Sequence, residues 1–325
     1  MQCPAGAPAP PREPRTIAVL IACYNEGPTI EKVVREFRHA LPEATVYVFD
    51  NNSTDDSAAL AAAAGAVVVP EKRQGKGHVV ASMLTRVRAD YYLMVDGDDT
   101  YPADRARDLL QPVVEGRADM VVGQRLSTYS DGSFRPFHVF GNRLVRDLIN
   151  LSFGSRLTDI LSGYRAFTRD VALQLPVVAS GFDVETEMTL QLLFRRFAIV
   201  EVPIAYGERP AGSFSKLRTF HDGFRVILKI LGIFKAYKPL TFFGGLGLAT
   251  FALGAAAGTV VVVQYVVYRY VYSVPLAVLA ASCMVLSIVL VAIGVMLHTL
   301  NFRILEMTNV LSKQIGALGE ERDRR

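Results

Sequence analysis

The sequence contains no tryptophan and only three cysteines in 325 residues. Cys3, Cys23 and Cys283 are too far apart for the paired spacing of a zinc site, and they do not indicate a disulfide framework. The net charge of +4 is too small to indicate a nucleic-acid partner. These shortages favour a protein whose catalytic part lies in the reducing cytoplasm.

Several common motifs are also missing. No Gly-x-Gly-x-x-Gly follows the first predicted strand, which argues against a dinucleotide-binding Rossmann domain. Gly75-Lys76-Gly77 lacks the longer glycine spacing, and the Ser or Thr, of a P-loop. Residues 1–14 are rich in Pro and Ala and have no apolar run of the signal-peptide kind, so we expect a disordered tail there.

Charge is absent from two long segments near the C-terminus, residues 240–268 and 270–302. A helix needs about twenty apolar residues to cross a bilayer, so each segment is long enough. The connector between them is short, which predicts a hairpin of two transmembrane helices, near residues 240–268 and 273–300, within the segment 239–302. A hairpin buried inside a soluble protein is the less favoured alternative.

Basic residues flank this hairpin on both sides, which predicts that both of its ends face the cytoplasm. Residues 217–238 combine an apolar face with several Lys and Arg, as in a helix that lies in the membrane interface; an ordinary surface helix is the alternative. We expect residues 303–325 to form a polar, helix-compatible tail on the cytoplasmic side. We therefore expect a multi-pass protein of the inner (plasma) membrane with a cytoplasmic catalytic domain.

Residues 15–216 predict an α/β domain, because β-prone apolar runs alternate with amphipathic stretches. Strands are expected at residues 16–23, 44–49, 66–69, 91–95, 119–122 and 199–202. One helix is expected after the first strand and ends near residue 40, and a second begins at a cap formed by Ser53 or Thr54. Further helices are expected over residues 78–88, 137–151 and 182–194. This alternation predicts a mostly parallel, doubly wound sheet.

Three carboxylates, Asp96, Asp98 and Asp99, directly follow the buried strand predicted at residues 91–95. Like charges at the end of a buried strand are costly unless a cation or hydrogen bonds offset them. Carboxylate oxygens suit Mg²⁺ or Mn²⁺, and ligands of open α/β sheets bind beyond the carboxyl ends of the strands. The alternative is a solvated acidic turn that caps the next helix.

Lys76 lies between two glycines directly before a predicted helix. Glycines at a helix entry let backbone N–H groups approach an anion, and the lysine adds a positive charge. A flexible helix entry without a ligand is the alternative.

Short polar segments follow the predicted strands in a fixed order. They are Ala-Cys-Tyr-Asn-Glu at 22–26, Asp-Asn-Asn-Ser-Thr-Asp at 50–55, Gly-Lys-Gly at 75–77, Asp-Gly-Asp at 96–98, Gly-Gln-Arg at 123–125, Asp-Ile-Leu-Ser-Gly-Tyr-Arg at 159–165, and Arg209 with Lys216. Together they resemble family 2 glycosyltransferases of the GT-A fold, and within them the polyisoprenyl-phosphate glycosyltransferases, the dolichol-phosphate-mannose-synthase and GtrB-like group. The chain departs from that pattern at Ala22, where the family has Pro, and at Asn51 and Asn52, where it has Asp and Gly.

The resemblance implies roles for particular residues. The nucleotide sugar would be bound by Ala22, Tyr24, Glu26, Asp50, Lys76, Asp96, Gly97 and Lys216. Asp98, with Asp96, would hold Mg²⁺ or Mn²⁺, and the catalytic set would be Asp96, Asp98, Asp159 and Arg209. Two arginines, Arg125 and Arg135, are candidates for binding the acceptor phosphate, although either could instead form a surface ion pair.

The implied reaction is an inverting transfer of a hexose from a nucleotide-diphosphate sugar to a membrane polyprenyl phosphate, undecaprenyl or dolichyl. UDP-glucose is the favoured donor and GDP-mannose the next. A processive polysaccharide synthase is disfavoured, because that group carries a Gln-x-x-Arg-Trp motif and this chain has no Trp. A non-catalytic membrane scaffold, a lipid-sugar translocation partner, a hydroxyl acceptor and a homo-oligomer stay open.

Overall fold

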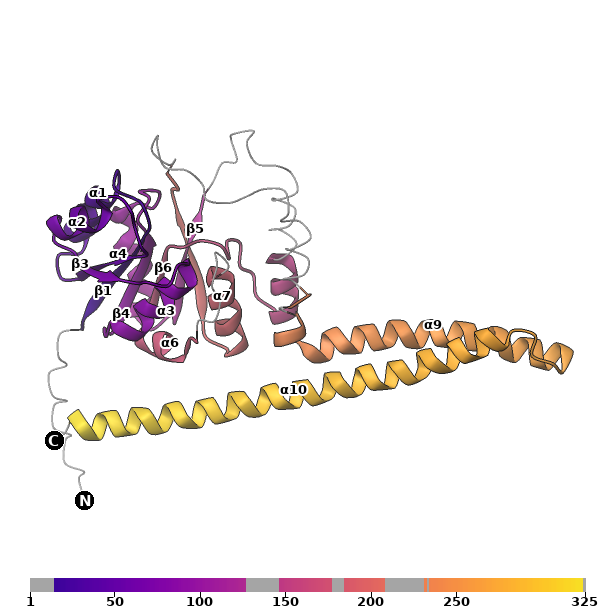
Figure 1. The fold of residues 1–325 in the computed structure, drawn as a ribbon. Coiled ribbons are helices and arrows are strands. Elements are labelled where there is room, and N and C mark those ends of the chain that lie inside the picture. The colour runs from indigo at the N-terminus through magenta and orange to yellow at the C-terminus, as the bar shows by residue number, and fades with distance from the viewer. Residues whose placement is uncertain (1–14, 127–145, 177–183, 208–230, 233, 324–325) are drawn as a thin grey trace, which may run out of the picture. The chain divides into compact units, whose positions relative to one another are not determined.

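The computed structural model describes residues 15–126, 146–176, 184–207, 231–232 and 234–323 (Figure 1). The chain divides into two units, one with the sheet and its helices and one with the two long C-terminal helices. Three candidate site residues, Arg135, Arg209 and Lys216, lie outside the described residues. So does most of the segment 217–238 that is expected to be an interfacial helix.

The first unit contains a seven-stranded sheet in the order β3-β2-β1-β4-β6-β5-β7. Its strands are β1 (Ile17–Cys23), β2 (Thr45–Asp50), β3 (Val67–Pro70), β4 (Tyr91–Asp96), β5 (Met120–Arg125), β6 (Arg165–Thr168) and β7 (Ile199–Ile204). Only β6 runs antiparallel to its neighbours, β4 and β5, and every other pairing is parallel. The mostly parallel α/β fold predicted from the sequence is therefore confirmed.

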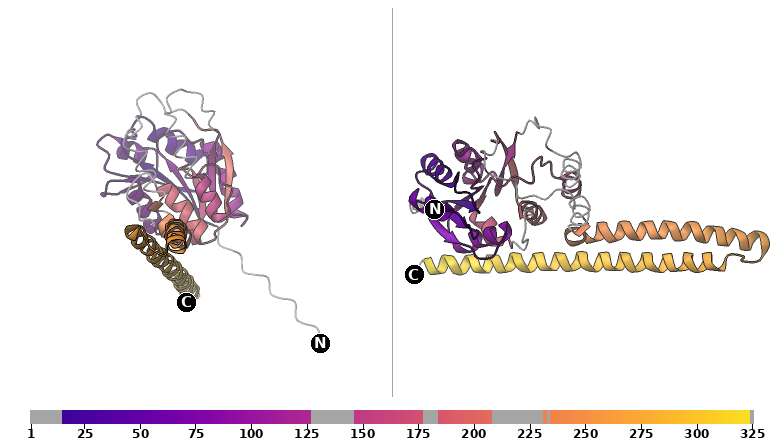
Figure 2. Two further views of the ribbon diagram at one scale, coloured as in Figure 1. Left: turned by 90° about the vertical axis from the view of Figure 1, so that its right-hand side faces the viewer. Right: turned by 45° about the horizontal axis from the view of Figure 1, so that its top comes forward.

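Helices cover both faces of this sheet (Figure 2). They are α1 (Ile30–Ala40), α2 (Ser57–Ala63), α3 (Lys76–Arg86), the short 3₁₀ helix η1 (Ala103–Arg105), α4 (Ala106–Val114), α6 (Arg169–Gln174) and α7 (Val184–Phe194). Side chains alternate along β1, so that Val19 and Ile21 pack with α1, α2 and α4 while Leu20 packs with α3, α6 and α7. Burial on both faces explains why the parallel strands read as continuous apolar runs.

Several elements differ from expectation. β6 lies in a polar stretch and is only four residues long, so its sequence carried no strand signal. The cap predicted at Ser53 or Thr54 is wrong, because α2 begins at Ser57 and its N-cap residue is Asp56. Of the helix expected over residues 137–151, the described part is helical at residues 146–153.

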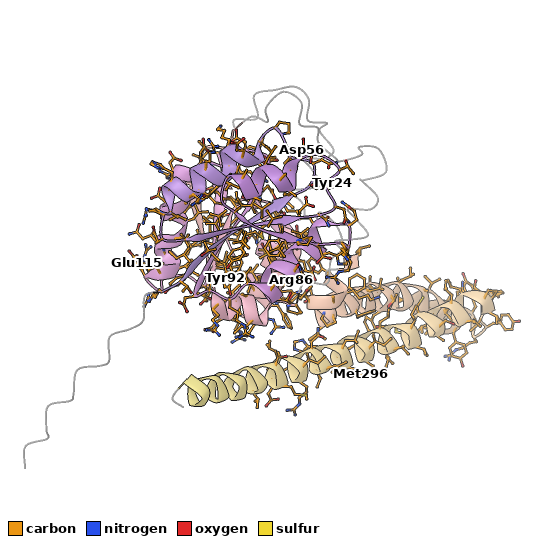
Figure 3. All side chains as sticks on the ribbon, turned by 60° about the vertical axis from the view of Figure 1, so that its left-hand side comes forward. Tyr24, Asp56, Arg86, Tyr92, Glu115 and Met296 are labelled. Atoms are coloured by element: carbon orange, nitrogen blue, oxygen red, sulfur yellow. The ribbon has the colours of Figure 1, made fainter. Side chains whose placement is uncertain are left out.

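The second unit consists of α9 (Pro239–Tyr268) and α10 (Val274–Asp323), which run side by side in Figures 1 and 2. Among the described residues, these two helices are long and apolar enough to cross a membrane, judged by length and composition. Large apolar side chains point outward, as Met296 shows in Figure 3, and it is 71% exposed. A water-soluble helix pair would bury such side chains, so the hairpin suggests a membrane-associated protein.

Small residues form the contact between α9 and α10. Added Cβ atoms at Gly247 and Gly254 would lie 2.9 Å from side-chain atoms of α10. The Ser287 hydroxyl donates a hydrogen bond of 2.8 Å to the carbonyl of Gly247. In lipid, burial of apolar surface does not favour helix association. Helices associate there through close packing at small residues such as glycine and through hydrogen bonds such as that from the serine hydroxyl.

Candidate active site

The candidate residues lie along one edge of the sheet. The parallel strands β1, β2, β4 and β5 end there, and antiparallel β6 begins there. In Figure 3, Tyr24, which follows β1, and Glu115, which follows α4 and precedes β5, lie on opposite sides of the first unit. The edge with Tyr24 is therefore the carboxyl edge, where open α/β sheets bind ligands.

Serines connect the two loops that follow β1 and β2. The backbone N–H of Asn25 donates to the Ser53 hydroxyl at 2.9 Å, and that of Glu26 donates to the Ser57 hydroxyl at 2.8 Å. Asn25 and Asn52 both have positive φ, 53° and 61°, which Asn tolerates better than most residues. These bonds hold the loop that carries the half-buried Tyr24 and Glu26 against the segment that follows Asp50.

Asp50, at the end of β2, has a buried carboxylate oxygen without a partner. Its Oδ2 accepts a long hydrogen bond of 3.4 Å from the N–H of Ser53, whereas Oδ1 is buried and has no hydrogen-bond partner among the described residues. Unsatisfied buried acceptors are rare and need an explanation. A ligand that donates an N–H to Oδ1 would provide one, as expected if Asp50 holds a nucleoside.

Cys23 lies beside this carboxylate at the end of β1. Burial, with the nearby charges of Asp50 and Glu26, raises the pKa of its thiol to about 12. The thiol is therefore neutral at physiological pH and is not a nucleophile.

Asn51 braces the loop that leads into α3. Its amide nitrogen donates to the carbonyls of Glu71 and Arg73 at 3.0 and 2.7 Å, and its amide oxygen accepts from the N–H of Gly75 at 2.7 Å. The Gly75 N–H is thus already used and is not available to an anion, contrary to the expectation that the glycines here let backbone N–H groups approach one. Asn51, which stands where the resemblance would have Asp, therefore acts as a structural brace.

Lys76, the first residue of α3, binds two carboxylates. Its Nζ lies 2.6 Å from Asp96 Oδ1 and 2.6 Å from Glu185 Oε1. Burial opposes the positive charge, but the two carboxylates raise the pKa of Lys76 above its ordinary value. The sequence placed Lys76 and Asp96 in one site, and the structure adds Glu185, the second residue of α7.

Gly163 and Tyr101 enclose this ion-paired group. A Cβ added to Gly163 would lie 2.7 Å from Asp96 Oδ2 and 3.2 Å from Lys76 Nζ, so a larger residue would displace the Asp96 carboxylate. The Gly163 N–H donates to the Tyr101 hydroxyl at 2.9 Å. Gly97 is also tightly placed, since its N–H donates to the carbonyl of Ala22 at 3.0 Å.

Asp98 and Asp99 point to different partners. Asp98 is 4% exposed, and its Oδ1 accepts hydrogen bonds from the hydroxyl and N–H of Thr100 at 2.6 and 3.3 Å. Asp99 has a φ of 61° and an ion pair of 2.7 Å with Lys32. Neither is the N-cap residue of η1, which is Pro102. The acidic turn therefore does not cap the next helix.

The donor set fits a hard divalent cation. Among the described residues no group of three or more His, Cys, Asp or Glu could hold a metal on its own. Mg²⁺, however, is usually bound by one or two carboxylates together with substrate phosphates. Asp96 and Asp98, on either side of Gly97, could supply those carboxylates.

Arg125, the last residue of β5, forms a two-pronged ion pair with Asp159. Its Nε and Nη2 donate to the two carboxylate oxygens at 2.7 and 2.9 Å, and its backbone N–H donates at 3.1 Å. Burial disfavours both charges, but the pairing outweighs it, so the pKa of Asp159 is lowered and that of Arg125 is raised. The guanidinium also lies over the ring of Tyr206, 5.3 Å from its centroid.

Glu201 of β7 holds the loop that carries Asp159. Its carboxylate accepts hydrogen bonds from the N–H and hydroxyl of Thr158 and from the N–H of Asp159, at 2.7 to 2.9 Å. Arg165, by contrast, is fully buried and donates to the carbonyls of Ser162 and Ile160. Arg165 is therefore a structural residue.

Aromatic rings connect the two ion-paired groups. The ring centroids of Tyr206 and Tyr101 are 5.3 Å apart, and Tyr101 bonds Gly163 beside Asp96. The structure thus brings Asp96 and Lys76 into one site with Arg125 and Asp159. Sequence reasoning missed Glu185, Glu201, Gly163, Tyr101 and Tyr206, and only Gly163 lies within a segment that the resemblance singled out.

Comparisons with known proteins agree with this geometry. Residues 18–175 match the glycosyl transferase family 2. Glycosyltransferase AglJ of Haloferax volcanii is 35% identical over 284 residues, which cover 87% of this chain and 93% of that protein. The chain belongs to glycosyl transferase family 2. Its glycosyltransferase activity and its GT-A-like fold follow from that membership.

A second relative and one solved structure have names that state a substrate or a ligand. Polyprenol monophosphomannose synthase of Mycolicibacterium smegmatis is 28% identical over 222 residues, 63% of this chain and 82% of that protein. A crystal structure of glucosyl-3-phosphoglycerate synthase from Mycobacterium tuberculosis, in complex with Mn²⁺, uridine diphosphate and phosphoglyceric acid, superposes with a TM-score of 0.54 at 25% identity. That match covers 67% of this chain and 78% of the other.

Proposed function

We propose that this glycosyltransferase transfers a hexose from a nucleotide-diphosphate sugar to the phosphate of a membrane polyprenol, with inversion at the anomeric carbon. UDP-glucose is the favoured donor and GDP-mannose the next. The observation that carries the proposal is one site, at the carboxyl edge of the sheet, that combines acidic and basic groups in a chain with a hairpin long enough to span a membrane. The relative named for polyprenol monophosphomannose synthesis supports the acceptor class.

The donor would bind at the Asp50 and Asp96 side of the site. Asp50 Oδ1 offers an acceptor to the base, and Tyr24 and Glu26 lie in the loop bonded to it. A divalent cation held by Asp98, with Asp96 beside it, would supply charge neutralisation for the diphosphate that leaves. Arg209 and Lys216 are the proposed cationic partners of that diphosphate, and Lys76 holds Asp96 in place.

The acceptor would bind at the Arg125 side. Nε and Nη2 of Arg125 donate to Asp159, which fixes the guanidinium, so its remaining N–H groups would be left to bind a phosphate in a fixed orientation. A phosphate monoester has a second pKa near about 6 and is largely a dianion at neutral pH, so it needs no strong general base. Asp159, paired with Arg125, therefore orients the acceptor site, and Arg135 would add a second cation.

The membrane arrangement follows from the same proposal. The hairpin formed by α9 and α10 would anchor the protein in the inner membrane, with residues 15–216 in the cytoplasm and residues 217–238 in the interface. Such an arrangement places a soluble donor and a lipid acceptor at one surface. A homo-oligomer is compatible with it.

The test is a panel of nucleotide sugars incubated with membranes that contain the full-length protein and undecaprenyl phosphate. We expect one donor to give a lipid whose mass equals polyprenyl phosphate plus one hexose. No lipid-linked sugar from any donor, with intact nucleotide binding, would favour a scaffold. Equal transfer to neutral polyprenol would move the function to a hydroxyl acceptor.

A further inference from the structure

Glu185 is a buried carboxylate for which the proposed chemistry has no direct use. It is 4% exposed, lies in the first turn of α7, and contacts Lys76 Nζ at 2.6 Å. Lys76 already has a partner in Asp96. Burying a second carboxylate against one ammonium carries a desolvation cost, so the arrangement calls for an explanation beyond stability.

The three groups come from three separate elements. Lys76 begins α3, Asp96 ends β4 and Glu185 lies on α7, so each is held by a different part of the fold. A lysine side chain is long and flexible, and a single partner would leave its ammonium free to follow Asp96. With Glu185 as a second partner, the position of Nζ is fixed from two sides.

Asp96 is confined on its other side by Gly163. The Cβ position of Gly163 lies 2.7 Å from Asp96 Oδ2, whereas Oδ1 contacts Lys76 at 2.6 Å. Once Lys76 is fixed, the carboxylate of Asp96 has one orientation. We propose that Glu185 is a positioning residue of the donor site: it anchors Lys76, which in turn holds the Asp96 carboxylate in the orientation that binds the donor.

The inference rests on the proposed function in taking Asp96 as a donor-binding residue. It has a consequence that direct contact between Glu185 and the substrate would not have. In the wild-type chain, Glu185→Gln removes the anchor and harms donor binding. In a Lys76→Met chain, the partly exposed Asp96 and the buried Glu185 would be neighbouring like charges without the ammonium between them, so Glu185→Gln removes a repulsion and improves donor binding.

The experiment is a double-mutant cycle on the full-length protein in detergent. The variants are Glu185→Gln, Lys76→Met and their combination, with Glu185→Asp to keep the charge. The matched control is Glu187→Gln, because Glu187 lies on the same helix and its carboxylate accepts from Gln191 at 3.0 Å. Measurements are the Kd of uridine diphosphate and of guanosine diphosphate with Mn²⁺, the melting temperature, and KM for donor and for lipid phosphate.

We expect Glu185→Gln to weaken nucleotide-sugar use about ten- to a hundred-fold, the usual effect of losing a residue that orients a ligating group. Donor KM should rise while KM for lipid phosphate stays the same, and Glu185→Asp should retain more activity than Glu185→Gln. In the Lys76→Met chain, Glu185→Gln should raise nucleotide affinity. If Lys76→Met does not fold, Lys76→Gln takes its place in the cycle.

An equal loss from Glu185→Gln in both backgrounds would overturn the inference, because Glu185 would then act without Lys76. A Glu185→Gln variant with the nucleotide Kd and donor KM of the wild-type chain would overturn it as well. The nucleotide Kd and melting temperatures need no lipid acceptor. A wild-type chain that binds nucleotide but makes no lipid-linked sugar would therefore count against the proposed function while leaving this cycle decisive.

Discussion

The two units of this protein bury opposite kinds of residue. The sheet unit buries large apolar side chains together with charged groups such as Asp98, Glu185 and Arg165. The hairpin buries glycine, alanine and serine, and it exposes most of its Leu, Ile and Val. The sheet unit therefore has the burial pattern of a domain surrounded by water, in which the carboxyl edge of the sheet can carry charge. The hairpin has the pattern of helices surrounded by lipid.

The largest expected effect is the loss of sugar transfer without loss of membrane insertion. Asp98→Ala should abolish sugar transfer while the hairpin still inserts, because in the proposed function Asp98 supplies the carboxylate for the divalent cation. Transfer is measured by lipid product, with and without EDTA, and insertion by membrane fractionation. Asp99→Asn is the control, since Asn tolerates its φ of 61° and the residue pairs with Lys32. Undiminished, EDTA-resistant transfer by Asp98→Ala would exclude the metal role.

Removing the hairpin should preserve the nucleotide site and impair use of the lipid acceptor. A chain truncated after Tyr237 should still bind nucleotide but should lose most of its activity on long-chain polyprenyl phosphate. The reason is that the lipid acceptor would no longer be concentrated at the same surface as the site. Activity on the long-chain lipid in vesicles is compared with activity on a short, water-soluble prenyl phosphate. Equal loss on both would mean that the hairpin supports folding of the sheet unit.

A third change distinguishes the two ion-paired groups within the sheet unit. Arg125→Ala removes a charge-assisted contact worth about 1.5–3 kcal/mol, so KM for lipid phosphate should rise about ten- to a hundred-fold. Donor KM should change little. The double variant Arg125→Ala with Asp159→Asn should be more stable to heat than Arg125→Ala alone, because the single change leaves Asp159 without its ion-pair partner.

In the hairpin, the sensitive positions are glycines. Gly254→Leu should weaken the packing of α9 on α10 by about 1–3 kcal/mol, because overpacked contacts must shift. The Cβ would lie 2.9 Å from Cys283 Cβ and 3.1 Å from the carbonyl of Ala280. Gly244→Leu is the control, since nothing lies within 4 Å of its Cβ position. Detergent unfolding should distinguish the two variants, while nucleotide binding should be the same in both.

The smallest effect concerns acid. A hydrogen bond from Arg73 lowers the pKa of Glu71 from 4.5 to about 2. A depressed pKa contributes stability above pH 4.5 that is lost as the pH falls towards 2. Because the guanidinium of Arg73 is largely exposed, solvent screens this pair and its contribution is small. Glu71→Gln should therefore reduce the acid sensitivity of the sheet unit, seen in melting curves between pH 5 and 2, and leave the hairpin unaffected.

The sequence predicted what local patterns determine. Apolar runs located six of the seven strands, and the acidic residues after β4 and the glycines around Lys76 indicated the edge of the site. β6 could not be found, since four residues that contain a buried Arg165 show no strand pattern. Pairings between distant elements, such as Lys76 with Glu185 or Thr158 with Glu201, depend on the packed sheet and leave no local signal.

Asn51 occupies a position at which an amide, and not a carboxylate, satisfies the neighbouring backbone groups. Its amide both donates and accepts, so it joins two carbonyls and one N–H of the segment that runs into α3. A carboxylate of the same size could serve only the N–H and would face the two carbonyls with like partial charge. Asn and Asp are therefore not interchangeable at this position. Because the amide does not titrate, the brace keeps the same strength across the pH range in which the carboxylates around it gain and lose protons.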